Sequence, residues 1–234
     1  MKKYFIVIAF VLPLLWAPVF AATFLTGKII ALDAGHGGGE TGAVNKLHGV
    51  KEEDVNLSVV DVLKAKLEAP EAGAYVVVTA RLSSRKDRVD DAIAKCAALD
   101  FNSDGVGDGR KCDALVSVHH NGNNVDPNHD GTLVIYNEKK DKPLAEKMLA
   151  ALVPLTGQSE GLENGGYGMT VYGNLVSVLT EAYYITNDAK AWRYLYDLNA
   201  EGVSNLVVEE ADAQVRGLAD YFASRTSGGK GGRK

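Results

Sequence analysis

Short apolar runs alternate with longer amphipathic segments along the chain. Apolar runs rich in β-branched residues predict buried strands over residues 28–34, 75–79, 114–119, 132–136 and 176–181. Apolar positions at helical spacing predict helices over residues 52–67, 85–99, 142–155 and 201–223. This alternation is typical of an α/β layer fold. Because no helix separates the third strand from the fourth, we expect one domain with a mixed, mostly parallel twisted sheet flanked by helices.

Three of these predicted strands end next to side chains that could carry chemistry. His36 follows the first strand within a glycine-rich turn, and His119 and Glu181 close two later strands. Functional groups in α/β folds gather outside the carboxyl ends of the strands. Glu52 begins a helix that can point back to the same edge. Two histidines and a glutamate match a catalytic zinc site with one open position for water, although the turn around His36 alone could be a plain strand end.

Four segments in a fixed order carry a resemblance to a known family. They are residues 33–38 (DAGHGG), 52–57 (EEDVNL), 117–121 (SVHHN) and 179–187 (LTEAYYITN). With these motifs the chain resembles the zinc-dependent N-acetylmuramoyl-L-alanine amidases, which are peptidoglycan amidases of the AmiA/AmiC type (amidase_3). The resemblance extends from about Lys28 to the last predicted helix.

The resemblance implies a site and a reaction. It implies that His36, Glu52 and His119 bind Zn²⁺ and that Glu181 is the catalytic carboxylate, which passes a proton from water to the leaving amine. The bond cleaved would join the lactyl group of N-acetylmuramic acid to L-alanine. Glu53 competes with Glu52, but the family's glutamate lies four residues before an asparagine, and Asn56 therefore selects Glu52.

Several positions depart from the family pattern or have a plainer interpretation. Glu40-Thr41 follows the glycines where the family usually has Asp-Pro, and residues 81–88 do not align cleanly. His120 occupies a position where the family often has a small residue, and its side chain would point to the opposite sheet face from His119. His48 is expected in a loop and His129 in a surface turn. Candidate substrate contacts, on position alone, are Asn164, Tyr167 and Tyr172.

The first residues have the pattern of a secretory signal peptide. Two lysines precede an apolar run from Tyr4 to Phe20, which ends in Ala21-Ala22. We therefore predict a signal peptide over 1–21, the zinc amidase domain over 22–225 and a flexible basic tail over 226–234. The mature chain would be exported to a periplasm or to the cell exterior, with no stable membrane insertion after cleavage.

The net charge limits the classes of partner. Residues 1–21 hold two lysines and no acidic residue, so their removal takes the formal charge from −5 to about −7. An acidic protein is a poor candidate for binding nucleic acid or anionic lipid. Peptidoglycan is the expected partner, and we expect the protein to be a monomer.

Two cysteines flank an inserted polar loop. Export favours a disulfide between Cys96 and Cys112, with two buried free thiols as the alternative. The loop between them has oxygen-bearing side chains at the spacing that begins a calcium loop, but it lacks the final glutamate. A Ca²⁺ site and a plain surface turn both remain possible for these residues, which are Asp100, Asn102, Asp104 and Asp108.

Three other functions compete with the amidase interpretation. The pattern around Ser159 (GQSEG) matches a serine-hydrolase elbow, but no strand precedes it and no histidine follows it. A non-catalytic wall-binding module would be expected to lose site residues. A zinc hydrolase for another amide substrate is harder to exclude, because pocket shape sets specificity. About sixty residues separate His119 from Glu181 and already hold predicted elements, so we expect activity without an activator.

Overall fold

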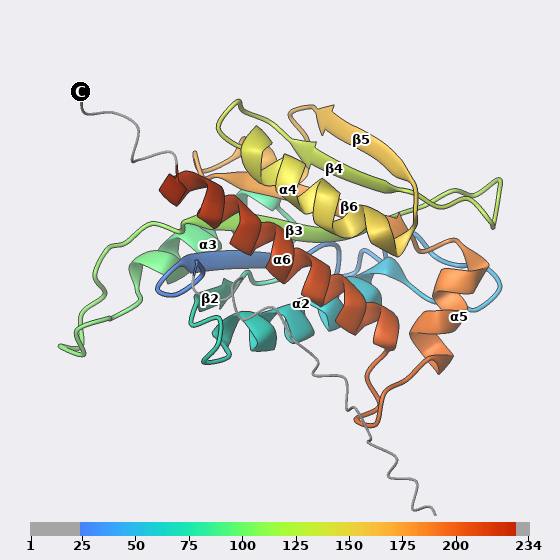
Figure 1. The fold of residues 1–234 in the computed structure, drawn as a ribbon, viewed down its shortest axis with the longest axis horizontal. Helices are drawn as coiled ribbons and strands as arrows, with labels where there is room; N and C mark the ends of the chain where they lie inside the picture. Colours follow the sequence, from blue (N-terminus) through green and yellow to red (C-terminus); the bar gives the residue numbers. More distant parts are fainter. Residues whose placement is uncertain (1–23, 228–234) are drawn as a thin grey trace, which may run out of the picture.

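A computed structural model describes residues 24–227 and contains one six-stranded sheet with helices on both faces (Figure 1). The strands are β1 (Ile29–Ala34), β2 (Tyr75–Val78), β3 (Ala114–Asn121), β4 (Thr132–Tyr136), β5 (Ser159–Asn164) and β6 (Ser177–Tyr184). The α-helices are α2 (Glu52–Glu68), α3 (Arg85–Ala97), α4 (Lys142–Leu152), α5 (Asp188–Tyr196) and α6 (Asn205–Ser227). Two short 3₁₀ helices are η1 (Val153–Leu155) and η2 (Gly168–Val171).

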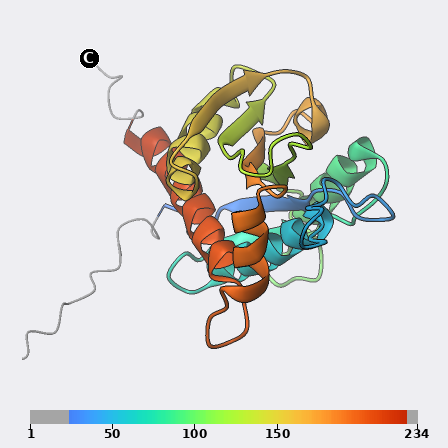
Figure 2. The same ribbon diagram turned by 90° about the vertical axis from the view of Figure 1, so that its right-hand side faces the viewer.

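The sheet has the strand order β2-β1-β3-β6-β4-β5. Strands β2, β1, β3 and β6 are parallel, whereas β4 is antiparallel to β6 and parallel to β5. The predicted mixed, mostly parallel sheet is therefore confirmed. Because β1, β3 and β6 run in the same direction, their carboxyl ends meet at one edge, where the loop after β1 and helix α5 also lie (Figure 2).

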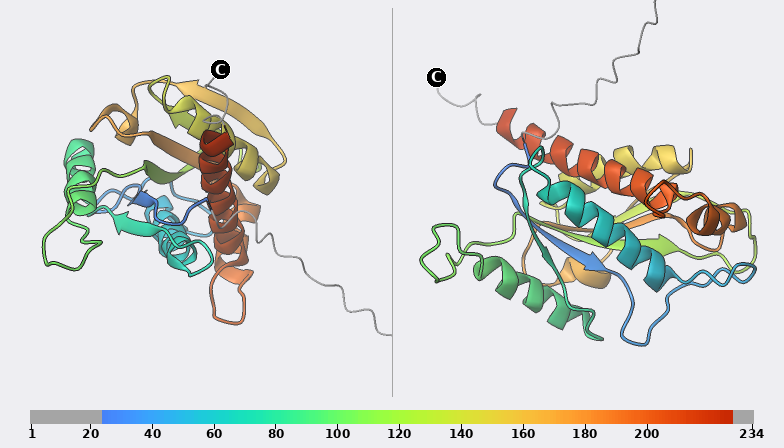
Figure 3. Two further views of the ribbon diagram at one scale, coloured as in Figure 1. Left: turned by 60° about the vertical axis from the view of Figure 1, so that its left-hand side comes forward. Right: turned by 90° about the horizontal axis from the view of Figure 1, so that it is seen from below.

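The two faces of the sheet have separate apolar cores. Helices α2, α4 and α6 cover one face, and α3 and η2 cover the other (Figure 3). The larger core lies under α6, which packs against both α2 and α4. Strand β1 is buried along its whole length because its alternate side chains enter both cores. This central position fixes the strand that leads to His36.

A disulfide joins the end of α3 to the chain just before β3. Cys96 and Cys112 are bonded, with Cα atoms 5.5 Å apart, which confirms the predicted pair. Both cysteines are buried in the smaller core. The bond closes the loop that contains residues 100–108 and anchors α3 to the sheet.

The predicted calcium site is not supported in this loop. Its carboxylates accept hydrogen bonds from the loop's own backbone: Asp100 from the amides of Asp104 and Gly105, and Asp108 from the amide of Phe101. Asn102 and Asp104 each accept a hydrogen bond from the amide two residues further on, as in Asx turns. The loop is therefore held as a surface turn by residues 100–108 themselves.

Four elements differ from the sequence-based prediction. Strand β5 and helix α5 were not predicted, and the last helix begins at Asn205 rather than at residue 201. A turn that contains Gly202 precedes α6, with residues Leu198 and Ser204 bridged across it. The predicted helix over 142–155 ends as α4 at Leu152 and continues as η1.

The predicted signal peptide lies outside the described residues, and so does the predicted basic tail beyond residue 227; residues 226 and 227 belong to α6. Among the helices of residues 24–227, none combines the length and the apolar character needed to span a membrane.

Candidate metal centre

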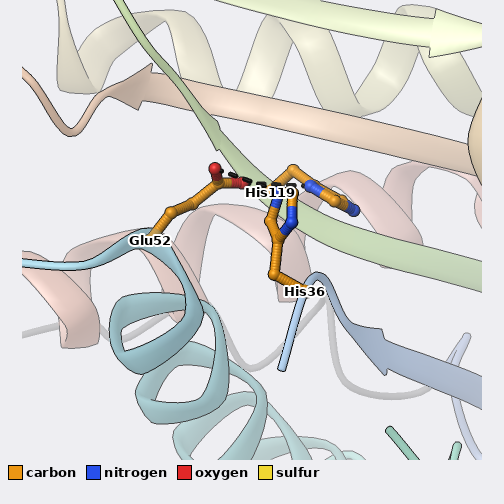
Figure 4. A group of neighbouring side chains, drawn as sticks. All are labelled: His36, Glu52 and His119. Carbon is orange, nitrogen blue, oxygen red and sulfur yellow. Dashed lines mark hydrogen bonds and ion pairs between the residues drawn. The ribbon is translucent and has the colours of Figure 1, made fainter. Parts of the chain in front are cut away.

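Three side chains converge at the carboxyl edge of the sheet (Figure 4). His36 lies in the turn after β1, Glu52 is the first residue of α2, and His119 lies on β3. One ligand atom from each residue lies within 4.8 Å of the other two. His36 Nε2 is 3.1 Å from one Glu52 oxygen, and His119 Nδ1 is 3.0 Å from the other. The structure thus brings together the three residues that the sequence predicted as zinc ligands.

The turn that presents His36 has an unusual backbone. His36 has a φ of 60°, in the left-handed region that few residues other than glycine adopt. The next three residues, Gly37, Gly38 and Gly39, also have positive φ. A side chain at Gly37 would collide with Arg81, because an added Cβ would lie 2.1 Å from Arg81 Nε. The glycine run therefore lets the chain turn sharply and lets an arginine approach its backbone.

Two arginines hold this turn from the side of α3. The His36 carbonyl accepts hydrogen bonds from Arg81 Nε at 3.2 Å and from Arg88 Nη2 at 2.7 Å. Arg88 is buried and also donates to the carboxylate of Asp33, at 3.2 Å, and to the Ala34 carbonyl. Asp33 accepts further hydrogen bonds from Thr79 and Ser117. These contacts support the backbone that carries His36, and sequence reasoning missed them.

Glu52 is fixed by backbone donors as well as by the two histidines. The Ala43 amide donates to one carboxylate oxygen at 2.9 Å, and the His120 amide donates to the other at 3.1 Å. Burial opposes its ionisation, but hydrogen bonds and charge from His119 and His36 outweigh burial and hold the pKa of Glu52 well below its usual value. Glu52 is therefore ionised, as a carboxylate ligand of a metal ion must be. Glu53 instead pairs with Lys51 and Arg81 away from the histidines.

A buried polar chain lies behind Glu52. His120 Nδ1 is 2.7 Å from Asn56 Oδ1, and His120 Nε2 is 2.8 Å from a carboxylate oxygen of Glu210 on α6. Asn56 donates to the Gly35 carbonyl and, at 3.4 Å, to Glu52. The His120 side chain thus contacts Asn56 and Glu210, whereas that of His119 contacts Glu52. In the sequence, this network was indicated only by a histidine at a position where the family often has a small residue.

Glu181 lies on β6 directly opposite His119 of β3 in the sheet register. Its Oε2 atom is buried and has no hydrogen-bond partner within the described residues. Burial raises the pKa of Glu181 well above its ordinary value, and the charges of Glu52 and Glu160 raise it further. A buried carboxyl group with a raised pKa and a free oxygen is suited to accept and release a proton.

These groups share one cavity of about 240 Å³. His36, Glu52, His119 and Glu181 all line it, with Tyr167 and Met169 on the wall formed by η2. Tyr167 is thus placed at the cavity, as predicted for a substrate contact. Tyr172 and Asn164 are not among the lining residues. His48 lies in an exposed turn beside Tyr196, and His129 pairs with Glu160 near the surface.

The donor set fits a zinc ion. Two imidazoles and one carboxylate are the ligand types of catalytic zinc sites, and three protein ligands leave a position for water or substrate. Imidazole ligands favour zinc over the harder cations magnesium and calcium. The buried, unpartnered oxygen of Glu181 in the same cavity is a further group that such a site would use. The residues present therefore fit zinc.

The position of Ser159 in the structure contradicts the serine-hydrolase interpretation. Ser159 begins the edge strand β5 and is exposed, rather than lying on a turn between a strand and a helix. Its hydroxyl accepts a hydrogen bond from the Gly161 amide. Ser159 is also not among the residues that line the cavity.

A family model and several relatives with similar sequences point to the same protein family. The model of the Amidase_3 family, described as N-acetylmuramoyl-L-alanine amidase, matches residues 30–208. The chain is 29% identical over 209 residues to the uncharacterized protein YqiI of Bacillus subtilis, and the match covers 86% of this chain and 88% of YqiI. It is 31% identical to the probable cell wall amidase LytH of Staphylococcus saprophyticus over 85% of this chain. This chain spans 60% of LytH.

Solved structures show the same fold. The N-acetylmuramoyl-L-alanine amidase AmiC2 of Nostoc punctiforme superposes with a TM-score of 0.67 at 24% identity. The superposition covers 85% of this chain and 99% of AmiC2. The sheet and the helices on its two faces therefore belong to a known architecture.

Proposed function

Because the chain belongs to the Amidase_3 family and is an N-acetylmuramoyl-L-alanine amidase, we propose that it works with one zinc ion held by His36, Glu52 and His119. The substrate is peptidoglycan, and the bond cleaved is the amide between N-acetylmuramic acid and L-alanine. One observation carries this proposal: three zinc-type ligands and a buried carboxyl group with an unpartnered oxygen line the same cavity.

Each site residue has a distinct task in the proposed reaction. Zinc, when bound, polarises the scissile carbonyl and lowers the pKa of water. Glu181 Oε2 accepts the proton of the attacking water and then delivers it to the nitrogen of the leaving L-alanine. The elevated pKa of Glu181 suits both transfers, since the group must bind the proton and then release it. The amides of Ala43 and His120 keep Glu52 oriented throughout.

The proposed cellular setting follows from the substrate. Peptidoglycan lies outside the cytoplasm, which agrees with the signal peptide predicted over residues 1–21. We propose an exported monomer whose amidase domain spans residues 22–225. The segment between His119 and Glu181 is occupied by β4, α4, η1, β5 and η2, and the cavity remains formed beside them. Activity without an activator therefore remains our proposal.

The direct test is digestion of isolated peptidoglycan. The mature protein should release stem peptides that begin at L-alanine, which mass spectrometry identifies. A chelator should abolish release, and zinc should restore it, because removal of the ion takes away the polarising group. Sugar fragments without free stem peptides, or cleavage that persists after zinc is fully removed, would contradict the proposal.

A variant of Glu181 separates proton transfer from metal binding. Glu181→Gln should lower kcat by about 10²–10⁴-fold, the usual contribution of a positioned general acid–base group. Zinc binding should be retained, because Glu181 is not one of the three ligands. Glu163→Gln, on the exposed edge strand β5, is the matched control and should be fully active. Normal activity of the Glu181 variant would refute its assigned role.

A further inference from the structure

One wall of the cavity combines the start of α3 with the segment around η2. Ser83 and Arg85 line the cavity from the first side, and Tyr167 and Met169 line it from the second. The two pieces are packed together in the smaller core, where Val89 of α3 lies with Met169 and Leu175. Met169 is thus buried in that core, whereas the side chains of Ser83, Arg85 and Tyr167 are exposed beside it.

Arg85 is the unpaired cation of this cavity. Among the lining residues, the side chains with a permanent positive charge are Arg85 and Arg88. Arg88 is buried and is fully occupied by Asp33 and by backbone carbonyls. Arg85 is exposed and, within residues 24–227, has no ion pair and no hydrogen bond. Its charge is therefore available to a ligand.

An aromatic ring stabilises Arg85 at the cavity. Its guanidinium carbon lies 5.9 Å from the centre of the Tyr167 ring, which is a cation–π distance. A ring in this position restrains a long, flexible side chain. The planar guanidinium keeps N–H donors at its edge, and these donors match the two oxygens of a carboxylate.

Several acidic side chains line the same cavity and would repel an anionic ligand. The carboxyl groups of Glu40, Glu52 and Glu181 also line this space. A carboxylate entering here without a cationic partner would meet like charges, which is unfavourable at short range. Among the side chains that line the cavity, Arg85 is therefore the one with a free positive charge to offset this repulsion.

We propose that Arg85, restrained by Tyr167, binds a carboxylate of the stem peptide and so selects an anionic over an amidated stem. This inference rests on the proposed function, since it names a substrate group of that same site. In the substrate, the lactyl carboxyl is consumed in the scissile amide, whereas free carboxylates belong to the peptide. The cation therefore lies on the side of the cavity that receives the peptide. Arg85 is a specificity-determining residue and takes no part in proton transfer.

The test compares two muropeptides that differ in one group. The first has a free α-carboxylate on the second residue of the stem, and the second has the same carboxyl group amidated. Arg85→Gln removes the charge but keeps a polar side chain. Arg110→Gln is the matched control, because Arg110 is also an arginine stacked on an aromatic ring, Phe101, but lies outside the cavity.

For Arg85→Gln, kcat/KM on the carboxylate substrate should fall by about 10–100-fold, as expected for a lost hydrogen bond to a charged group. The loss should appear mainly in KM, and the amidated substrate should change by less than about threefold. Arg85→Lys should recover only part of the loss, because it keeps the charge but not the planar fork. Equal losses on both substrates, or no loss on either, would overturn the proposal.

The role of Arg85 in binding can be measured without the amidase reaction. Calorimetry with the free stem peptides, carboxylate and amidated, needs no turnover. Wild-type protein should bind the carboxylate form about 10-fold or more tightly, and Arg85→Gln should abolish that preference. Wild-type protein that cleaves neither muropeptide would contradict the proposed function, while the peptide binding ratio would still decide the role of Arg85. Equal binding of both peptides by wild-type protein would refute it.

Discussion

Gly35 shows how closely the metal centre is packed at the level of single atoms. A Cβ atom added at this position would lie 2.3 Å from Nε2 and Cε1 of His119. The φ of Gly35 is not in the left-handed region, so the backbone itself would accept another residue. A glycine is therefore needed at position 35 because the imidazole ring of His119 lies against its backbone and leaves no room for a side chain.

Gly35→Ala should weaken zinc binding while the fold survives. The added methyl group must displace the His119 ring, and this ring supplies one of the three proposed ligands. We expect zinc affinity to fall at least about 10–100-fold, the range found when the support of a metal ligand is removed. Competition with a chromogenic chelator measures the affinity, and circular dichroism checks the fold.

Gly165→Ala is the matched control for this variant. Gly165 also lacks a positive φ, and the nearest atom to an added Cβ is 3.5 Å away, an ordinary contact distance. It should bind zinc like the wild type. Unchanged zinc affinity in Gly35→Ala would mean that the His119 ring can move without cost to the site.

Among single residues, the proposed site residues were easier to predict from the sequence than the residues that hold them in position. The four proposed site residues could be predicted, because each follows or lies within a motif at a strand end or a helix start. Arg81 and Arg88 could not, because their partner, the His36 carbonyl, is a backbone atom 45 and 52 residues away. Nothing in the pattern of side chains marks a backbone acceptor. Arg85 was hidden for a similar reason, since its use depends on Tyr167 reaching the same wall.

Among the secondary-structure elements, β1 and α3 are joined by a buried ion pair. Asp33 belongs to β1, Arg88 belongs to α3, and both side chains are at most 6% exposed. The carboxylate also accepts hydrogen bonds from Thr79 and Ser117, so its polar atoms are satisfied. Such a pair contributes little when intact but is costly to break, because the remaining charge stays buried.

Arg88→Met should lower the free energy of unfolding by about 3–5 kcal/mol, since it leaves Asp33 charged and buried. Urea denaturation gives the value. The matched control is Arg193→Met, which removes an ion pair with Glu209 whose side chains are 30% and 49% exposed and should cost under about 1 kcal/mol. The double variant Asp33→Asn with Arg88→Met should lose less than the sum of its two single variants. Additive losses would show that the two side chains act independently.

The elements missed from the sequence share a physical cause. Strand β5 is an edge strand with exposed polar residues, so it shows no alternation of apolar and polar positions. Its pairing depends on β4, which the local sequence does not show. Helix α5 is only nine residues long, and its start is marked by the Asn187 side chain capping the Lys190 amide. The longer buried strands and the helices α2 and α3 were predictable because their apolar spacing reflects burial in the two cores.

For the whole molecule, the Cys96–Cys112 disulfide strengthens the smaller of the two cores. It joins elements 16 residues apart in the sequence, and both cysteines pack with residues of β1, α3 and η2. The same core backs the wall that carries Arg85 and Tyr167. Loss of the bond should therefore affect global stability and the substrate-binding wall together.

The double variant Cys96→Ala with Cys112→Ala should lose about 3 kcal/mol of unfolding free energy, because a loop of this length is no longer closed in the unfolded chain. Denaturation of the wild type with and without reductant provides the internal comparison. The reduced wild type should approach the variant, and the variant should not respond to reductant. Equal stability of oxidised wild type and variant would show that the bond does not constrain the unfolded chain.

The place of β6 in the sheet has a consequence for the time at which this enzyme becomes active. Among the strands of residues 24–227, β6 is synthesised last, yet it lies between β3 and β4. Until it inserts, both neighbours expose unpaired backbone edges, which invite association with other chains. The β3–β6 contacts join residues about sixty positions apart, and non-local contacts of this kind form more slowly than local ones. Glu181, the proposed proton acceptor, belongs to this same strand, so under the proposed mechanism the chain becomes active only when its sheet is complete.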